Sequence, residues 1–160
     1  GRTLGHLYQS EFFKEVLNFI EGPPPSTNLF NEKNNGLSIL NLISEKLVNS
    51  VHDISSGGII LALYEMCNSG DIGVSIKIPN NEIKKHAYLF GEDQSRYIIE
   101  VKEDNMKKVK ETLKGNSIYF EEIGKTQKKY IEIEKNFKVD LNEINKCGKF
   151  WFNNYFKEAI

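Results

Sequence analysis

The stretch VHDISSGGIILALYEM, residues 51–66, places polar groups and glycines at the head of a nearly unbroken apolar run. Backbone N–H groups at the start of a helix lack intrahelical partners and carry partial positive charge, so such a head suits a phosphate or a carboxylate. Glycine allows a ligand to approach the backbone closely. A carboxylate could hold a hydroxyl group or, through a metal, a phosphate. The candidate binding residues here are His52, Asp53, Ser55, Gly57 and Gly58.

A second polar cluster lies in LFGEDQSRY, residues 89–97. It combines acceptors, a primary amide and a guanidinium, which could recognise an amide- and hydroxyl-bearing substrate through paired hydrogen bonds. The candidate residues are Glu92, Asp93, Gln94 and Arg96.

Both clusters also have a plainer interpretation. A serine of the first cluster caps a helix, its two glycines permit close packing, and the second cluster is a solvated turn whose ion pair contributes at most about 1 kcal/mol. The first cluster matches neither the GxxxxGK[ST] phosphate loop nor GxGxxG. The residues alone leave these interpretations open.

Metal binding and a disulfide are not expected. His6 and His86 are isolated, and histidines and cysteines this scattered do not form a metal site. Cys67 and Cys147 lie in apolar segments, which predicts two buried thiols in a reducing compartment.

Composition is that of an ordinary globular protein of 160 residues, 39% hydrophobic and 27% charged, which predicts one domain. Its 21 basic and 22 acidic residues nearly cancel, so no nucleic-acid or membrane partner is expected. No apolar run approaches the roughly 20 residues of a membrane span, and no signal peptide is seen, so we expect a cytoplasmic protein. The chain begins Gly-Arg-Thr, which we interpret as a piece of a longer protein.

The elements that position these clusters follow from periodicity. Ser10 is expected to cap a helix over residues 10–19 that GPPP ends, with Phe12, Phe13, Val16 and Phe19 or Ile20 on one face. A second helix is predicted over about residues 28–46, with four apolar residues facing the core. Glycine at position 36 disfavours this helix. The four apolar residues are Leu29, Leu40, Ile43 and Leu47.

Strands are predicted at 48–51, 74–78, 97–101, 117–123 and 130–133. Helices are predicted over 59–67, over 104–114 and from about Leu141, and the aromatic residues of that last helix are too continuous for one face. This order predicts an α+β, three-layer α/β domain with a mixed β-sheet flanked by helices. The aromatic residues are Phe150, Trp151, Phe152, Tyr155 and Phe156.

Five stretches together resemble one family. LGHLYQSEFF, EGPPPSTNLFNEKNNG, VHDISSGGIILALYEM, IGVSIKIP and HAYLFGEDQSRYIIEV occur in the order typical of the carboxy-terminal domain of the phosphoribosylformylglycinamidine synthases. The resemblance covers nearly the whole chain and implies the fold of the carboxy-terminal domain of aminoimidazole ribonucleotide (AIR) synthetase.

The resemblance also implies a function. These synthetases use ATP and Mg²⁺ to phosphorylate the amide oxygen of formylglycinamide ribonucleotide, and ammonia from a glutaminase subunit or domain then displaces phosphate to give the amidine. One domain would be inactive alone and would need the other domains of the parent chain.

Site residues follow from the same resemblance. His52, Asp53, Ser55, Gly57 and Gly58 match the family's His-Asp-x-Ser-x-Gly-Gly loop, Ser10 matches the serine of its Gly-Gln-Ser start, and Glu92, Asp93 and Gln94 match a substrate-binding Glu-Ser-Gln. No catalytic residue is assigned. The chain looks like the copy in the parent's second half, whose pocket would serve an auxiliary nucleotide.

Three positions depart from the family pattern. Ser56 replaces an acidic residue, and Tyr8 and Ser95 each replace a glycine. These departures keep an alternative open, a structural interaction domain without a ligand. A kinase or a selenophosphate synthetase of the same superfamily is a further alternative.

Overall fold

The computed structural model describes residues 1–79, 82–134 and 137–158. Its secondary structure is mixed, with helices and two β-sheets, and one sheet contains both parallel and antiparallel pairs. The predicted fold class is therefore confirmed. The chain divides into two compact units, residues 1–63 with 80–122 and residues 64–79 with 123–160. The prediction of a single domain stays a prediction.

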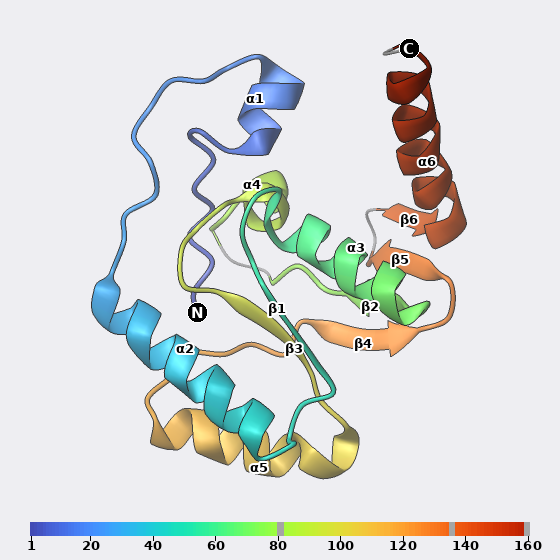
Figure 1. Ribbon diagram of the computed structural model, residues 1–160. Coiled ribbons are helices and arrows are strands. Elements are labelled where there is room, and N and C mark those ends of the chain that lie inside the picture. Colours follow the sequence, from blue (N-terminus) through green and yellow to red (C-terminus); the bar gives the residue numbers. More distant parts are fainter. Residues whose placement is uncertain (80–81, 135–136, 159–160) are drawn as a thin grey trace. The chain divides into compact units, whose positions relative to one another are not determined.

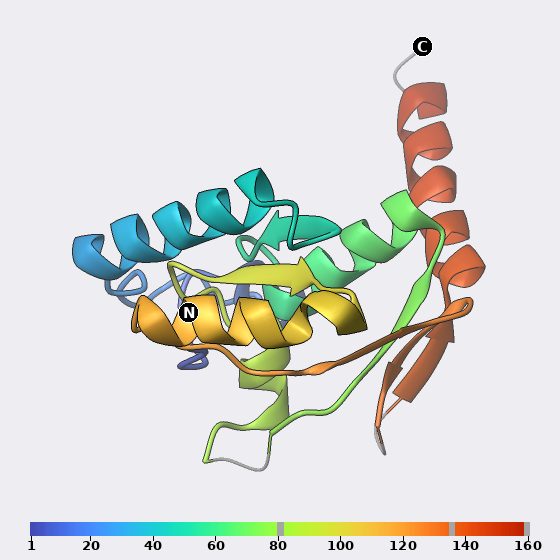
Figure 2. The ribbon, with the colours of Figure 1, turned by 90° about the horizontal axis from the view of Figure 1, so that it is seen from below.

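Unit 1 is built on a two-stranded antiparallel ribbon, β1 (Ser50–Asp53) and β3 (Tyr97–Glu100), in which Val51 pairs with Ile99. Helices α2 (Leu29–Ser44) and α5 (Glu103–Gly115) lie together on one side of this ribbon (Figures 1 and 2). Helix α1 (Glu11–Leu17), helix α4 (Lys85–Phe90) and the first half of α3 (Gly58–Gly70) complete the unit.

The core of this unit forms where the two helices meet the ribbon. Leu42, Leu47, Val109 and Leu113 are buried together, and Val48, Ile99, Val101, Ile118 and Phe120 pack against them. Their burial holds β1 and β3 in register. This register fixes the position of the loop that follows β1 after Asp53 and of the loop that ends at Arg96, just before β3.

Unit 2 is a four-stranded sheet in the order β4–β2–β5–β6. The strands are β2 (Gly73–Ile76), β4 (Gly124–Gln127), β5 (Tyr130–Ile133) and β6 (Phe137–Asp140), and only the β2–β5 pair is parallel among the described strands. The second half of α3 and helix α6 (Leu141–Glu158) belong to the same unit. Its buried residues include Val74, Ile76, Ile131 and Ile133.

One prediction about helix α2 is wrong. Leu47 is buried as expected, but Leu29, Leu40 and Ile43 are exposed. Helix α2 instead turns Asn35, Ser38 and Leu42 inward. Apolar periodicity predicts a face that packs into the core, but the apolar stripe of α2 lies on the opposite side of the helix.

Other boundaries also differ. Helix α1 ends at Leu17 because Asn18 takes a left-handed conformation (φ 53°), before GPPP is reached. Strand β1 begins at Ser50, two residues later than predicted. Residues 117–123 form no strand, and the next strand, β4, begins after them at Gly124. Helix α4 and strand β6 were not predicted.

The cysteine prediction holds in part. Both cysteines lie outside any disulfide, and Cys67 is buried, but Cys147 is exposed on α6. The side chains of Phe150, Trp151, Phe152 and Phe156 lie outside the described part of the chain, while Tyr155 is exposed. Among the described residues, no helix has both the length and the apolar character needed to cross a bilayer.

Candidate functional site

The Glu92 side chain brings three of the sequence motifs together. Its Oε1 accepts a hydrogen bond from the backbone N–H of Gly57 at 2.7 Å and from that of Glu11 at 2.9 Å. Gly57 belongs to the loop before α3, and Glu11 is the first residue of α1. One carboxylate therefore binds the start of one helix and the loop leading into another, where partial positive charge favours it.

Asp93 holds the N-terminal segment in the same way. Its Oδ2 accepts from the N–H groups of Leu4 and Gly5, both at 2.9 Å, and its Oδ1 accepts from His6 N–H at 3.2 Å. The carboxylate is buried. Three backbone donors and the nearby Arg96 satisfy its charge inside the fold.

Arg96 is the buried cation of this site. Its Nε donates to the Asp93 carbonyl at 3.0 Å, Nη2 donates to the Gly91 carbonyl at 2.6 Å, and Nη1 donates to Thr3 Oγ1 at 3.2 Å. Burial lowers the pKa of this guanidinium, and the Asp93 carboxylate counters that shift. The side chain thus fixes the turn 91–96 from within.

Ser10 caps helix α1, as predicted. Its Oγ accepts from Phe13 N–H at 3.2 Å and donates to the Leu7 carbonyl at 2.6 Å. The residue is completely buried. Its hydroxyl is therefore committed to the turn that leads from the N-terminal segment into α1.

Gly58 is required for close packing. It has φ +69°, and a Cβ there would lie 2.6 Å from the Leu89 carbonyl oxygen and 2.9 Å from that of Gly91. Its N–H donates to the Ser55 carbonyl at 3.1 Å. The start of α3 therefore lies directly against the end of α4, which brings the two polar clusters side by side.

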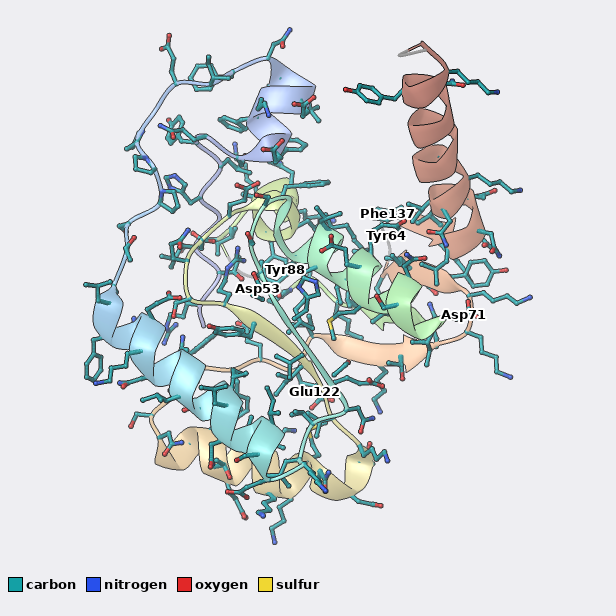
Figure 3. All side chains as sticks on the ribbon, viewed as in Figure 1. Asp53, Tyr64, Asp71, Tyr88, Glu122 and Phe137 are labelled. Atoms are coloured by element: carbon teal, nitrogen blue, oxygen red, sulfur yellow. The ribbon has the colours of Figure 1, made fainter. Side chains whose placement is uncertain are left out.

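Three of the remaining predicted site residues are exposed, and His52 is half-buried. Asp53 ends β1 (Figure 3) with a side chain 66% exposed, and Ser55 and Gln94 are exposed. His52 Nδ1 donates to the Asp53 carbonyl at 2.6 Å, because a carbonyl can only accept. These side chains have room to meet a ligand.

A hollow of about 1040 Å³ lies in unit 1 beside Gln94. Residues 52–58, all described, are not among its lining residues. Sequence reasoning missed most of its polar lining, although the asparagine-rich run NLFNEKNNG offered a signal. The polar lining includes Arg2, Ser26, Asn28, Asn31, Asn34, Asn35, Gln94, Asn116 and Ser117.

Among the described residues, no group of three or more His, Cys, Asp or Glu side chains lies close enough together to hold a metal ion. A phosphate at the start of α3 would compete with the chain's own acceptors for the backbone N–H groups there. The N–H of Gly57 already donates to Glu92, and that of Gly58 to Ser55. An anion that binds the Gly57 N–H would have to displace the Glu92 carboxylate.

The three departures from the family pattern are locally accommodated. Ser95 takes a left-handed conformation (φ 62°), where glycine is otherwise favoured, and its carbonyl and hydroxyl accept from Asn35 Nδ2 at 2.8 and 3.0 Å. Tyr8 lies on the surface with its ring edge toward Phe13. Ser56 is exposed.

Comparison with known proteins decides the family. Residues 13–135 match the family model described as AIR synthase related protein, C-terminal domain. The chain belongs to this family. It is also 45% identical over 157 residues to a phosphoribosylformylglycinamidine synthase subunit PurL of Pelagibacter ubique, covering 98% of this chain and 22% of that protein. A protein of the same name from Rhodopseudomonas palustris is 36% identical over 155 residues, which are 97% of this chain and 21% of that protein.

The likeness extends to solved structures. The Thermotoga maritima PurL complexed with FGAR has a TM-score of 0.65 at 17% identity, with 74% of this chain and 21% of that chain covered. At this identity the likeness shows the fold, and the AIR synthase-related fold that the sequence implied is confirmed. The chain spans about a fifth of the length of the curated relatives it matches.

Proposed function

We propose that this chain is the carboxy-terminal domain of a phosphoribosylformylglycinamidine synthase, an enzyme of purine biosynthesis. The proposed reaction is the ATP-dependent conversion of formylglycinamide ribonucleotide, with ammonia from glutamine, to the amidine, with release of ADP and phosphate. The observation that carries this proposal is the 45% identity to the Pelagibacter PurL over nearly the whole chain. We place the reaction in the cytoplasm.

The proposed substrate and nucleotide are inferred from relatives of similar fold. Thermotoga PurL structures are named as complexes with FGAR and with ATP, and another is named PurLQS. We infer that the parent enzyme of this chain takes the same ribonucleotide and ATP, and works with a glutaminase. We infer that Mg²⁺ accompanies ATP in the parent enzyme, held by the phosphates and one or two carboxylates.

In this proposal the chain binds and positions the ligand of the parent enzyme, and it carries no catalytic group. The exposed Gln94 amide beside the hollow has the donors and acceptor that an amide- or hydroxyl-bearing ligand requires. His52 and Asp53 at the end of β1 and Ser55 in the loop after it offer further polar groups, and Gly57 in the same loop donates to Glu92. We expect the isolated chain to be inactive.

A second candidate function is a structural interaction domain of the same enzyme that binds no ligand. The side chains of Ser10, Glu92, Asp93 and Arg96 favour it, because each makes hydrogen bonds inside the fold. Such side chains stabilise the domain whether or not a ligand is present.

A chimera tests the proposed reaction. The 160-residue chain replaces the matched 157 residues of the Pelagibacter PurL, and ADP release is measured with formylglycinamide ribonucleotide, MgATP and ammonia. Substrate-dependent turnover is the expected result. A monodisperse, folded chimera without turnover, beside an active unaltered relative, would overturn the proposal.

Ligand binding by the isolated chain separates the two candidates. Formylglycinamide ribonucleotide at 100 times its dissociation constant should stabilise the fold by about 2.7 kcal/mol, seen as a higher melting temperature. Gln94→Ala should reduce this shift, and the exposed Lys128→Ala should not. Absence of any shift with the ribonucleotide, MgATP or phosphate favours the interaction domain.

A further inference from the structure

Helix α2 exposes an apolar face to solvent. Five large apolar side chains on it are 47–77% exposed. At about 100° per residue they fall within about 140° of the helix circumference, so they lie on one side of the helix, with Lys33 and Gly36 between Phe30 and Leu37. The α2 face consists of Leu29, Phe30, Leu37, Leu40 and Ile43, and Phe30, at its edge, also lines the hollow beside Gln94.

Polar contacts hold the opposite side of the same helix. Asn35 Nδ2 donates to the Ser95 carbonyl at 2.8 Å, and Asn116 Nδ2 donates to Ser38 Oγ at 3.4 Å. Leu42 is the large apolar residue that α2 buries in the core of unit 1. The fold therefore leaves the more apolar side of α2 outside, although soluble monomers rarely expose a contiguous patch of this kind.

The charge pattern of the α2 face restricts its partner. Lys33 and Ser44 are the polar side chains within the arc of the stripe. Within the part of the chain that the structure describes, Lys33 makes no hydrogen bond or ion pair. A surface that covers this face must bury apolar groups and supply a carboxylate to Lys33, because an unpaired buried ammonium is costly.

We infer that the α2 face is the surface on which this domain docks against the remaining four fifths of the synthetase chain. This inference rests on the proposed function. In the relatives, the matched segment is about a fifth of one continuous polypeptide. A partner surface in the same chain acts at a millimolar effective concentration, so it competes well against partners in solution.

A second copy of the chain fits the α2 face less well. In a two-fold antiparallel pairing centred on α2, Lys33 would lie against Leu40 of the other copy. The α2 face itself carries no carboxylate among its described residues. Such a pairing would bury the ammonium against apolar side chains without a counter-charge.

Thiol labelling of the chimera tests this inference. Leu40→Cys is placed in a Cys147→Ser background, both in the isolated chain and in the chimera with the Pelagibacter protein. We expect a maleimide dye to label Leu40→Cys at least ten times more slowly in the chimera than in the isolated chain. Lys128→Cys, at an exposed turn outside α2, is the control and should react at similar rates in both.

Each outcome is decisive. Equal labelling rates of Leu40→Cys in chimera and isolated chain overturn the inference, as does protection in the isolated chain that grows with its concentration, which indicates self-association. Lys33→Glu should restore fast labelling in the chimera, and Lys33→Arg should not. If Leu40→Cys is labelled slowly in a chimera that has no turnover, the docking is supported and the proposed reaction is refuted. If the chimera turns over and Leu40→Cys is labelled fast, the proposed reaction is supported and the docking is refuted.

A measurement on the isolated chain makes the inference independent of the chimera. The double variant Leu37→Glu, Leu40→Glu should keep the melting temperature within about 2 °C and bind less of an apolar dye. A large fall in melting temperature would show that these residues support the fold of the domain itself and would refute the docking role. A Leu113→Glu variant, in the core of unit 1, should lose the fold and calibrates the measurement.

Discussion

At the scale of single residues, the site depends on two adjacent carboxylates with backbone partners. Glu92 accepts from the N–H groups of Gly57 and Glu11, and Asp93 accepts from three N–H groups of residues 4–6. Amide groups that could bind an external anion are thus bound by the chain's own acidic residues. The same acidic residues that resemble a substrate-binding motif assemble the N-terminal segment, α1 and the α3 loop into one site.

Replacing Glu92 tests this structural role. Glu92→Gln keeps an acceptor oxygen and loses the charge, so it should cost about 1 kcal/mol of unfolding free energy. Glu92→Ala leaves two backbone donors without their acceptor and should cost about 2–4 kcal/mol. Urea unfolding measures both changes. Glu111→Gln, exposed on α5, should change stability by less than about 0.5 kcal/mol, and an equal loss there would contradict the assignment.

The buried Tyr88 should make the stability of the folded protein depend on pH in the alkaline range. It is nearly completely buried, and its hydroxyl donates to Glu121 Oε2 at 3.5 Å. Burial, reinforced by the Glu121 charge, raises the pKa of Tyr88 above the value of about 10 expected in the unfolded chain. The folded state therefore prefers the neutral phenol, so this stabilisation is complete below pH 10 and is lost as the pH rises further.

The Tyr88→Phe variant lacks the titrating phenol, so it should not lose stability through this residue as the pH rises. Between pH 10 and pH 11.5 the wild type should lose up to about 1.4 kcal/mol per pH unit through this residue, and the variant should not. Unfolding free energies at pH 8, 10 and 11.5 measure the difference. The exposed Tyr155→Phe should keep the wild-type slope. Parallel slopes for Tyr88→Phe and wild type would show that another group controls alkaline unfolding.

The sequence allowed some of these residue roles to be predicted and not others. Ser10 was predicted as a cap because a cap depends on neighbours within three residues. The bond between Glu92 and Gly57 joins positions 35 apart, and that between Glu92 and Glu11 joins positions 81 apart. Local pattern carries no information on such pairs, so the resemblance identified the residues and the structure supplied their partners.

At the scale of elements, the approach of α3 to α4 determines the site. Gly58→Ala places a Cβ 2.6 Å from the Leu89 carbonyl oxygen at φ +69°. The clash and the left-handed backbone should together cost about 3 kcal/mol or more. Thermal unfolding of the variant measures this loss.

The matched control is Gly115→Ala at the end of α5, where a Cβ would meet no atom within 4 Å. It should stabilise the protein by about 0.5–1 kcal/mol, because alanine favours a helix over glycine. Similar melting temperatures for the two variants would show that the close approach of α3 and α4 is not required.

Helix α2 shows why a correct helix can be assigned the wrong face. Its existence was predicted from periodicity, and both ends were predicted to within about two residues. The direction of its apolar stripe was not, because periodicity reports that some apolar surface is to be buried and not which surface buries it. Asn35 and Ser38 pack inward since each has a hydrogen-bond partner there. A stripe that serves a larger assembly looks identical in sequence to one that serves a core.

At the scale of the whole molecule, helix α3 is the element that both units share. Its residues Ile59, Ala62 and Leu63 belong to unit 1 and Cys67 belongs to unit 2, and all four side chains are buried. A helix gains its stability from packing along its whole length and is costly to nucleate in short pieces. Loss of the packing at one half of α3 therefore weakens the other half.

We accordingly expect the two units to unfold in one transition. Leu42→Ala, in the core of unit 1, and Ile131→Ala, in the sheet of unit 2, should each cost about 2–5 kcal/mol and lower the same single midpoint. Calorimetry and near-ultraviolet circular dichroism should give one coincident transition for the wild type and both variants. Two transitions, with each variant shifting only one of them, would show that α3 breaks between its halves and that the units are independently stable.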